Sequence, residues 1–138
     1  MTETWLEDTT WLDEAQCWEL LRSRNLGRLG YHLVDEVHIV PVNYVVDGQR
    51  LVFRTTPGSK LLGVVMDDDV AFEVDAQDET GAWSVLARGR ARVLEGDEKR
   101  KAGMLPLQPW SAGDKLTIVA IDVQTVTGRE FGERPTAD

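Results

Sequence analysis

The chain has 138 residues, with 15 basic and 24 acidic side chains and a formal net charge of −9 at pH 7. Its length predicts one domain, and its excess of acid argues against a general nucleic-acid-binding protein, which needs clustered lysine and arginine. A single cysteine excludes an internal disulfide, and with two histidines it is too little for a Cys/His metal cage, so no metal site is expected.

The single cysteine predicts a cytoplasmic protein, and the N-terminal region argues against export. It lacks the basic and apolar regions of a signal peptide, and no apolar run in the chain approaches the roughly 20 residues that span a bilayer. Residues 1–12 form an acidic leader ahead of an expected single domain at 13–130 and a tail at 131–138. Because Trp5 and Trp11 are costly to leave in water, the leader either lies across the domain or a partner or is a frayed tail.

The first expected helix begins at Asp13. Gln16 follows Asp13 at the spacing of a capping box, in which each side chain bonds to the other residue's backbone. Gly27 suits the end of this helix. Apolar residues recur at helical intervals between these points: Cys17, Leu20 and Leu21.

From residue 26 the hydrophobic period changes from helical to two. The β-branched stretch 37–46 predicts a strand, Asp47-Gly48 a tight turn, and 51–55 a second strand, so these residues are expected to form a β-hairpin. Pro41 cannot donate a hydrogen bond to a ladder. Its place is therefore a sheet edge or a bulge, where neighbouring backbone groups are free for a ligand.

The rest of the chain predicts further short elements. Alternating residues indicate strands at 70–75, 83–94 and 116–123, and other patterns indicate helices at 59–66 and 96–103 and a rigid loop at 105–110. About six antiparallel strands with short helices favour a small closed or nearly closed β-barrel. Three arginines share one face of the strand at 83–94, either as an anion-binding row or as a solvated face: Arg88, Arg90 and Arg92.

A segment with many hydrogen-bond donors, residues 54–60, leaves a predicted strand through a Pro-Gly turn and enters a predicted helix. Free amides at a helix N-terminus, hydroxyl groups and cations are what a phosphate group requires. The order of its glycine, lysine and hydroxyl residues excludes a Walker loop. The segment predicts a phosphate site, with an ordinary loop of solvated charges as the alternative.

A second segment, residues 38–44, has features that suit a flat heteroaromatic ring. Pro41 exposes backbone next to Asn43, whose amide can both donate and accept hydrogen bonds. The alternative is that His38 and Tyr44 only pack. Because both segments belong to one predicted hairpin, a ligand with a ring at one end and a phosphate at the other could span them. Flavin mononucleotide (FMN) fits, but spacing does not select it over other phosphorylated heterocycles.

A series of motifs in order resembles the pyridoxamine 5′-phosphate oxidase-like family of flavin-binding split barrels, and most closely its short bacterial, nitroimidazole-resistance-type members. The resemblance covers roughly residues 13–129 and implies a mainly β, antiparallel six-stranded split barrel of the FMN-binding type. It also implies a homodimer with FMN at the subunit interface. The motifs lie at 38–44, 51–55, 58–60, 70–75, 81–85 and 88–91.

The resemblance also implies roles for individual residues. Trp83 would cover the flavin ring or come from the partner subunit, with core packing as the alternative. Trp110 and Arg129 would form walls of the partner's site or be structural. The flavin phosphate would be held by Arg54, Thr55, Thr56, Ser59 and Lys60. The ring would be bordered by Pro41, Val42, Asn43 and Tyr44.

The implied function is an FMN-dependent oxidoreductase that reduces a small organic or nitro compound by hydride transfer through the flavin. His38 is the candidate proton donor. The chain shows no equivalent of the arginine-rich C-terminal segment that holds substrate phosphate in vitamin B6 oxidases, so a different substrate is expected. Two alternatives stay open: a non-catalytic flavin- or haem-binding module, and a deazaflavin-dependent reductase.

Overall fold

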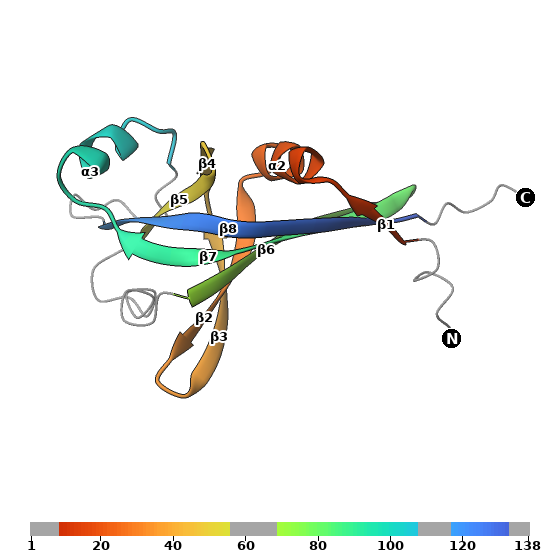
Figure 1. Ribbon diagram of the computed structural model, residues 1–138, viewed down its shortest axis with the longest axis horizontal. Helices are drawn as coiled ribbons and strands as arrows, with labels where there is room; N and C mark the ends of the chain where they lie inside the picture. Colours follow the sequence, from red (N-terminus) through yellow and green to blue (C-terminus); the bar gives the residue numbers. More distant parts are fainter. Residues whose placement is uncertain (1–8, 56–68, 108–116, 133–138) are drawn as a thin grey trace, which may run out of the picture.

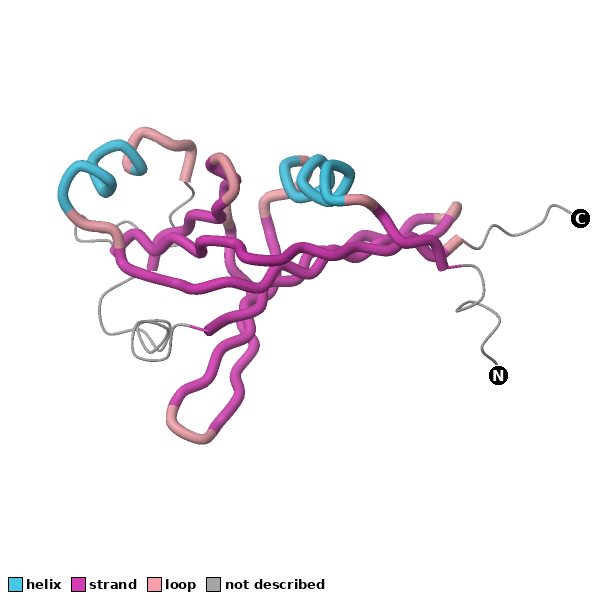
Figure 2. The backbone as a smooth tube through the Cα atoms, in the orientation of Figure 1, coloured by secondary structure: helices cyan, strands magenta, loops and turns pink. Residues whose placement is uncertain are grey.

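A long antiparallel sheet, curled on itself, contains most of the residues described by the computed structural model, which are 9–55, 69–107 and 117–132 (Figures 1 and 2). The strand order is β3-β2-β6-β7-β8-β5-β4, and β1 adds to β8. In chain order the elements are β1 (Thr9–Leu12), α2 (Glu14–Arg22), β2 (Leu26–Leu33), β3 (Glu36–Asn43), β4 (Val45–Asp47), β5 (Arg50–Thr55), β6 (Asp69–Asp78), β7 (Gly81–Val93), α3 (Gly96–Ala102) and β8 (Thr117–Phe131).

This architecture confirms the expected mainly β, antiparallel split barrel with short helices. The described residues form eight strands rather than six. One reason is that the stretch expected as a single strand at 37–46 divides at Tyr44 into β3 and β4. The other is that Thr9–Leu12, within the predicted leader, forms β1 and pairs with the end of β8. The last strand also continues past residue 123 to Phe131.

The curl of the sheet follows from the connection between β3 and β4. These two strands lie at opposite ends of the strand order, yet only Tyr44 separates them in the chain. The N–H of Tyr44 donates to the carbonyl of Asn25 at 3.0 Å, and its hydroxyl donates to the carbonyl of Leu21 at 2.6 Å. β3 also contacts β5, so the two edges of the sheet meet.

The predicted capping box at the start of α2 is confirmed. Gln16 N–H donates to Asp13 Oδ1 at 2.8 Å, and Asp13 N–H donates to Gln16 Oε1 at 2.9 Å. The predicted end was wrong: α2 ends at Arg22, and Gly27 lies in β2. A Cβ on Gly27 would lie 2.5 Å from the ring of Phe72, so this glycine serves close packing rather than helix termination.

Two apolar cores lie on opposite faces of β5. The larger one fills the inside of the curl and includes Phe53, Phe72 and the buried face of α2. The smaller one lies beneath α3 and includes Val52, Leu94 and Ile118. Neither α2 nor α3, the helices in the described part of the chain, is long and apolar enough to cross a membrane.

The strands β7 and β8 form the longest pairing and continue beyond the curl toward β1, at the right of Figure 1. Their register shifts between Arg88 and Gly89, which is a β-bulge. A Cβ on Gly89 would collide with the carbonyl oxygen of Asp122, so this close backbone approach requires glycine. The predicted helix at 59–66 and residues 108–110 of the predicted loop lie outside the described residues.

Candidate functional site

The described part of the predicted cofactor site lies where β3 meets β5. β4 pairs with β5 through Val45 and Val52. Continued past that pair, this register would place Asn43, the last residue of β3, beside Arg54. The contact between β3 and β5 agrees with this placement. The two predicted segments are therefore neighbours in space, but not as the two strands of one hairpin, because β3 pairs with β2.

Arg54 carries a buried polar atom that has no hydrogen-bond partner among the described residues. Its side chain is half-buried at the end of β5, and its Nε donates no hydrogen bond to any residue that the structure describes. A buried N–H without an acceptor is unfavourable, and a bound anion would satisfy it. Thr55, the next residue, is 7% exposed. The other predicted phosphate ligands lie outside the described residues: Thr56, Ser59 and Lys60.

Pro41 lies on β3, an edge strand of the sheet, as its missing N–H predicted. It is exposed and pairs with Arg28 on β2. Asn43 uses one amide N–H to donate to the carbonyl of Asn25 at 2.9 Å, which fixes the plane of its amide group. The outer edge of β3 therefore presents backbone groups and an oriented amide beside Arg54, which suits a flat ring with polar edges.

The side chains of Val42 and Tyr44 point into the core, where they are 4% and 2% exposed. The Tyr44 ring meets Phe72 edge-on, with 5.0 Å between centroids. Burial raises the pKa of Tyr44, so its phenol stays neutral and donates to Leu21. At both positions, contact with a ligand would therefore come from the backbone.

His38 belongs to a different polar pair. Its ring stacks on Tyr31 with 5.3 Å between centroids. Both His38 Nε2 and the Tyr31 hydroxyl are buried, and neither forms a hydrogen bond within ranges 9–55, 69–107 and 117–132. Nε2 lies 3.3 Å from Glu36 Oε1, but the geometry does not make a hydrogen bond. Burial raises the pKa of Tyr31. Five residues of strand, about 17 Å, separate His38 from Asn43.

Trp83 and Arg129 lie at the far end of the β7–β8 pairing. Trp83 pairs with Glu130, whereas Arg54 pairs with Ile118, twelve residues earlier on β8. Twelve residues of strand span about 40 Å. Within one chain, Trp83 and Arg129 therefore do not reach the predicted phosphate site. Trp110, the third predicted wall, lies outside the described residues.

The three arginines of the row on β7 differ in their bonding partners. Arg92 Nε donates to Asp122 Oδ2 at 2.6 Å, and its Nη1 lies 2.8 Å from Glu98 Oε1. Arg90 lies 3.8 Å from Asp69. These contacts favour the interpretation of the row as a solvated face with ion pairs.

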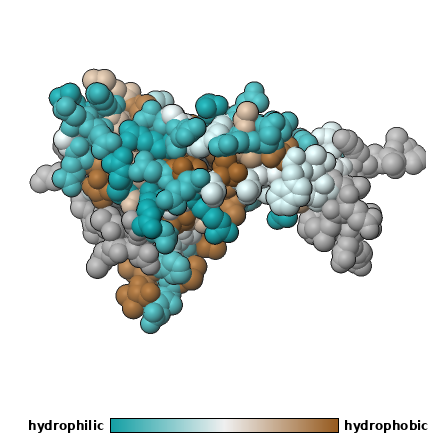
Figure 3. Space-filling view, viewed as in Figure 1, coloured by the Kyte–Doolittle hydropathy of each residue, from teal (hydrophilic) through white to brown (hydrophobic). Residues whose placement is uncertain are grey.

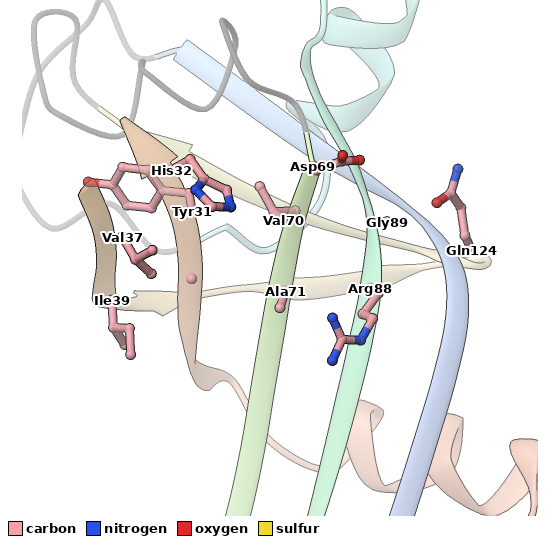
Figure 4. Close-up of a pocket in the computed structure, with 11 residues that line it drawn as sticks. Tyr31, His32, Val37, Ile39, Asp69, Val70, Ala71, Arg88, Gly89 and Gln124 are labelled. Atoms are coloured by element: carbon pink, nitrogen blue, oxygen red, sulfur yellow. The ribbon is translucent and has the colours of Figure 1, made fainter. Parts of the chain in front are cut away.

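Arg88 borders a cavity of about 440 Å³ on the outer face of the sheet (Figure 4). Val37 and Ile39 line its β3 side and are 70% and 69% exposed, and Gln124 lines its β8 side. This cavity was not predicted from the sequence. The one local signal for it is that Val37 and Ile39 are apolar on the solvent-facing side of β3, where an antiparallel edge strand normally carries polar side chains.

Comparisons with known proteins identify the family and support the fold. The family model of pyridoxamine 5′-phosphate oxidase matches residues 13–130. A Corynebacterium glutamicum protein named for that enzyme is 35% identical, with a TM-score of 0.84 over 99% of both chains. The FAD binding protein of Mycobacterium smegmatis is 34% identical, with a TM-score of 0.79 over 90% of this chain and 98% of its own. A Bacteroides thetaiotaomicron protein named for 5-nitroimidazole antibiotic resistance shares the fold, with a TM-score of 0.74 at 17% identity over 90% and 89% of the two chains.

Proposed function

The chain belongs to the pyridoxamine 5′-phosphate oxidase-like family, and on that premise we propose that it is a flavin-dependent oxidoreductase with FMN as its cofactor. The observation that carries the proposal is the buried, unpartnered Nε of Arg54 beside the open edge of β3. FMN ends in one phosphate, which this cation would receive. The relative from Mycobacterium smegmatis binds FAD, so FAD is the competing cofactor.

Each described residue has a distinct part in this proposal. Arg54 binds the phosphate through its guanidinium, and the fixed amide of Asn43 hydrogen-bonds the edge of the ring. The exposed backbone of β3 around Pro41 lies along the same edge. A bound flavin supplies two-electron redox chemistry, so the protein's task is to place a small organic or nitro compound against the ring and exclude water. His38 is the proposed proton donor for a substrate that extends along β3, because it lies about 17 Å of strand from Asn43.

The site is proposed to be completed by a second copy of the chain. Trp83 and Arg129 lie about 40 Å of strand from the position of Arg54, so only a partner subunit could bring them to the flavin. The β2–β3 hairpin projects from the curled sheet with apolar side chains at its tip (Figure 3). Val34 there is 88% exposed, which suits burial against a second copy.

Flavin binding by matched variants tests the cofactor site. The purified protein is titrated with FMN, FAD, a deazaflavin and haem, with absorbance and fluorescence as readouts. Arg54→Met should weaken FMN binding at least about tenfold, because it removes a charged hydrogen bond. Arg50→Met is the control, because Arg50 is on the same strand but is ion-paired with Asp47 at 3.0 Å. Equal FMN affinity in both variants would contradict the placement of the phosphate at Arg54. Tighter binding of FAD than of FMN would identify FAD as the cofactor.

Mixed dimers test the composite site. Arg54→Met and Trp83→Ala would each impair both sites of a homodimer, but a heterodimer of the two variants keeps one intact site. Mixing should restore about one quarter of the wild-type flavin sites if the subunits exchange at random. No recovery in a sample shown to contain heterodimers would exclude Trp83 as a residue of the partner's site.

Turnover separates an enzyme from a binding module. Steady oxidation of NADH or NADPH by the flavin-loaded protein, with a nitroaromatic acceptor, is the expected result. His38→Ala should then lower turnover without changing flavin affinity. Stoichiometric flavin binding without turnover across a panel of donors and acceptors would instead support a non-catalytic flavin-binding module.

A further inference from the structure

A second cavity, of about 320 Å³, lies on the outer face of the sheet at its β1 end. The strand registers build its floor in two rows. In the first row Trp11 lies beside Arg129, and Arg129 lies beside Ser84. In the second row Thr127 lies beside Leu86, and Leu86 lies beside Glu73. The lining residues are Trp11, Glu73, Ser84, Leu86, Thr127, Gly128 and Arg129.

Arg129 is held in this cavity by aromatic rings. Its guanidinium carbon lies 5.7 Å from the ring centre of Trp11 and 5.4 Å from that of Phe131. Among the ranges that the structure describes, no carboxylate forms an ion pair with it. Cation–π contacts occupy the faces of a guanidinium and leave the N–H groups at its edge to donate. The cavity therefore contains an oriented cation whose charge is not neutralised by a described side chain.

Glu73, which lines this cavity, shares an arginine partner with Asp75. Arg28 on β2 lies 2.8 Å from Glu73 Oε1 and 3.0 Å from Asp75 Oδ2. Burial, together with the neighbouring Asp75, raises the pKa of Glu73 to about 7. The Arg129 end of the cavity therefore stays positive, whereas Glu73 and Asp75 add negative charge at the other end. Such a field accepts a singly charged anion more readily than a doubly charged phosphate.

We propose that this cavity binds the carboxylate of a small monocarboxylic acid with a planar apolar body. The edge of Arg129 receives the carboxylate, and the hydroxyls of Ser84 and Thr127 donate to it. Trp11, which is 67% exposed, and Leu86 contact the body of the acid. A volume of this size fits a molecule with one ring. The lining residues all belong to one chain. Because Arg129 is also a proposed wall of the partner subunit's flavin site, benzoate is titrated into flavin-free protein, so that the two proposals can fail separately.

Benzoate is the probe that tests this proposal. Titration of the full chain with benzoate, followed by calorimetry and by NMR of side-chain N–H groups, should show saturable binding that shifts Arg129 Nε–H and the Trp11 indole. Benzamide, which has the same shape without the charge, should bind at least about tenfold more weakly. Inorganic phosphate should also bind more weakly than benzoate. A higher affinity for phosphate or equal binding of benzamide would overturn the proposal.

A matched pair of variants assigns the site. Arg129→Met should weaken benzoate binding at least about tenfold. Arg24→Met is the control, because its guanidinium also lies over an indole, 5.8 Å from the Trp83 ring, but on the opposite face of the same strands. Ser84→Ala, which removes one hydroxyl and no charge, should cause a smaller loss. Thermal unfolding confirms that each variant is folded, and benzoate affinity unchanged in folded Arg129→Met would exclude the site.

Discussion

The arginines at the two ends of the β7–β8 pairing have different bonding partners. At the α3 end, Arg92 is bonded to Asp122 at 2.6 Å and to Glu98 at 2.8 Å. At the β1 end, Arg129 lies against Trp11 and makes no ion pair with a carboxylate of the described ranges. An ion-paired arginine holds elements of its own chain together, whereas one held by rings keeps its N–H donors for a ligand. The bonding of each arginine, rather than its place in a charged row, indicates its role.

The bulge at Gly89 separates these two ends, and its disruption has the largest expected effect. Gly89→Ala should lower the free energy of unfolding by about 3 kcal/mol, because the new Cβ would collide with the carbonyl of Asp122. Urea unfolding measures this loss. Gly30→Ala is the control in β2, where a Cβ would have its nearest neighbour at 3.7 Å. Comparable stability of the two variants would mean that the bulge relaxes easily.

Removing an arginine from each end tests the comparison directly. Arg92→Met should reduce the free energy of unfolding by about 1 kcal/mol, because Asp122 and Glu98 lose their shared partner. Arg129→Met should change it by no more than about 0.5 kcal/mol, because the side chain is exposed. Chemical unfolding at low and moderate salt gives both values. A larger loss of stability in Arg129→Met than in Arg92→Met would contradict the proposed difference between the two ends.

The acid at the paired end should respond to pH. Hydrogen bonds from Arg92, with a smaller contribution from Arg50, lower the pKa of Glu98 from 4.5 to about 2. The stability from this ion pair is present above the unfolded chain's pKa and is lost as pH falls from about 4.5 toward 2. NMR titration should show this pKa rising in Arg92→Met and unchanged in Arg100→Met, whose ion pair is with Asp97. A normal Glu98 pKa in the wild type would contradict the network.

Glu73, the acid near the β1 end, should give the opposite dependence of stability on pH, and its effect is expected to be the smallest. Glu73 has its pKa raised from 4.5 to about 7 mainly by burial, so between these values the folded chain holds a proton that the unfolded chain has lost. Stability therefore falls as pH rises through this window. Glu73→Gln should flatten the fall in melting temperature, and Glu79→Gln, an exposed glutamate in the β6–β7 turn, should not. An unchanged slope in Glu73→Gln would place the cause elsewhere.

The parts of the fold that depend on neighbouring residues were predictable from the sequence. The capping box at Asp13, the edge position of Pro41 and the alternation along β7 each follow from local chemistry. The break at Tyr44 was not, because it depends on hydrogen bonds to Asn25 and to the end of α2, which are tertiary contacts. The packing of Gly27 against Phe72 is likewise a long-range contact.

The candidate site was predictable in part for the same reason. Arg54 and Asn43 come together because the turn after β4 brings them back within a few residues. The distance from Arg54 to Trp83 depends on the register of β8, which pairs with both β5 and β7 and which no local pattern indicates. The cavity beside Arg129 likewise requires β1 to pair with β8.

Tyr44 also bears on the order in which the chain folds. The two edges of the curled sheet meet at β3 and β4, which are consecutive in sequence, and we call this junction the seam at Tyr44. Forming it closes only a short loop and therefore costs little chain entropy. The pairing of β1 with β8, in contrast, joins residues near the two ends of the chain. Contacts between residues distant in sequence form slowly. We therefore expect the seam at Tyr44 to form early and the β1 strand, with its cavity, to be the last part of the sheet to assemble.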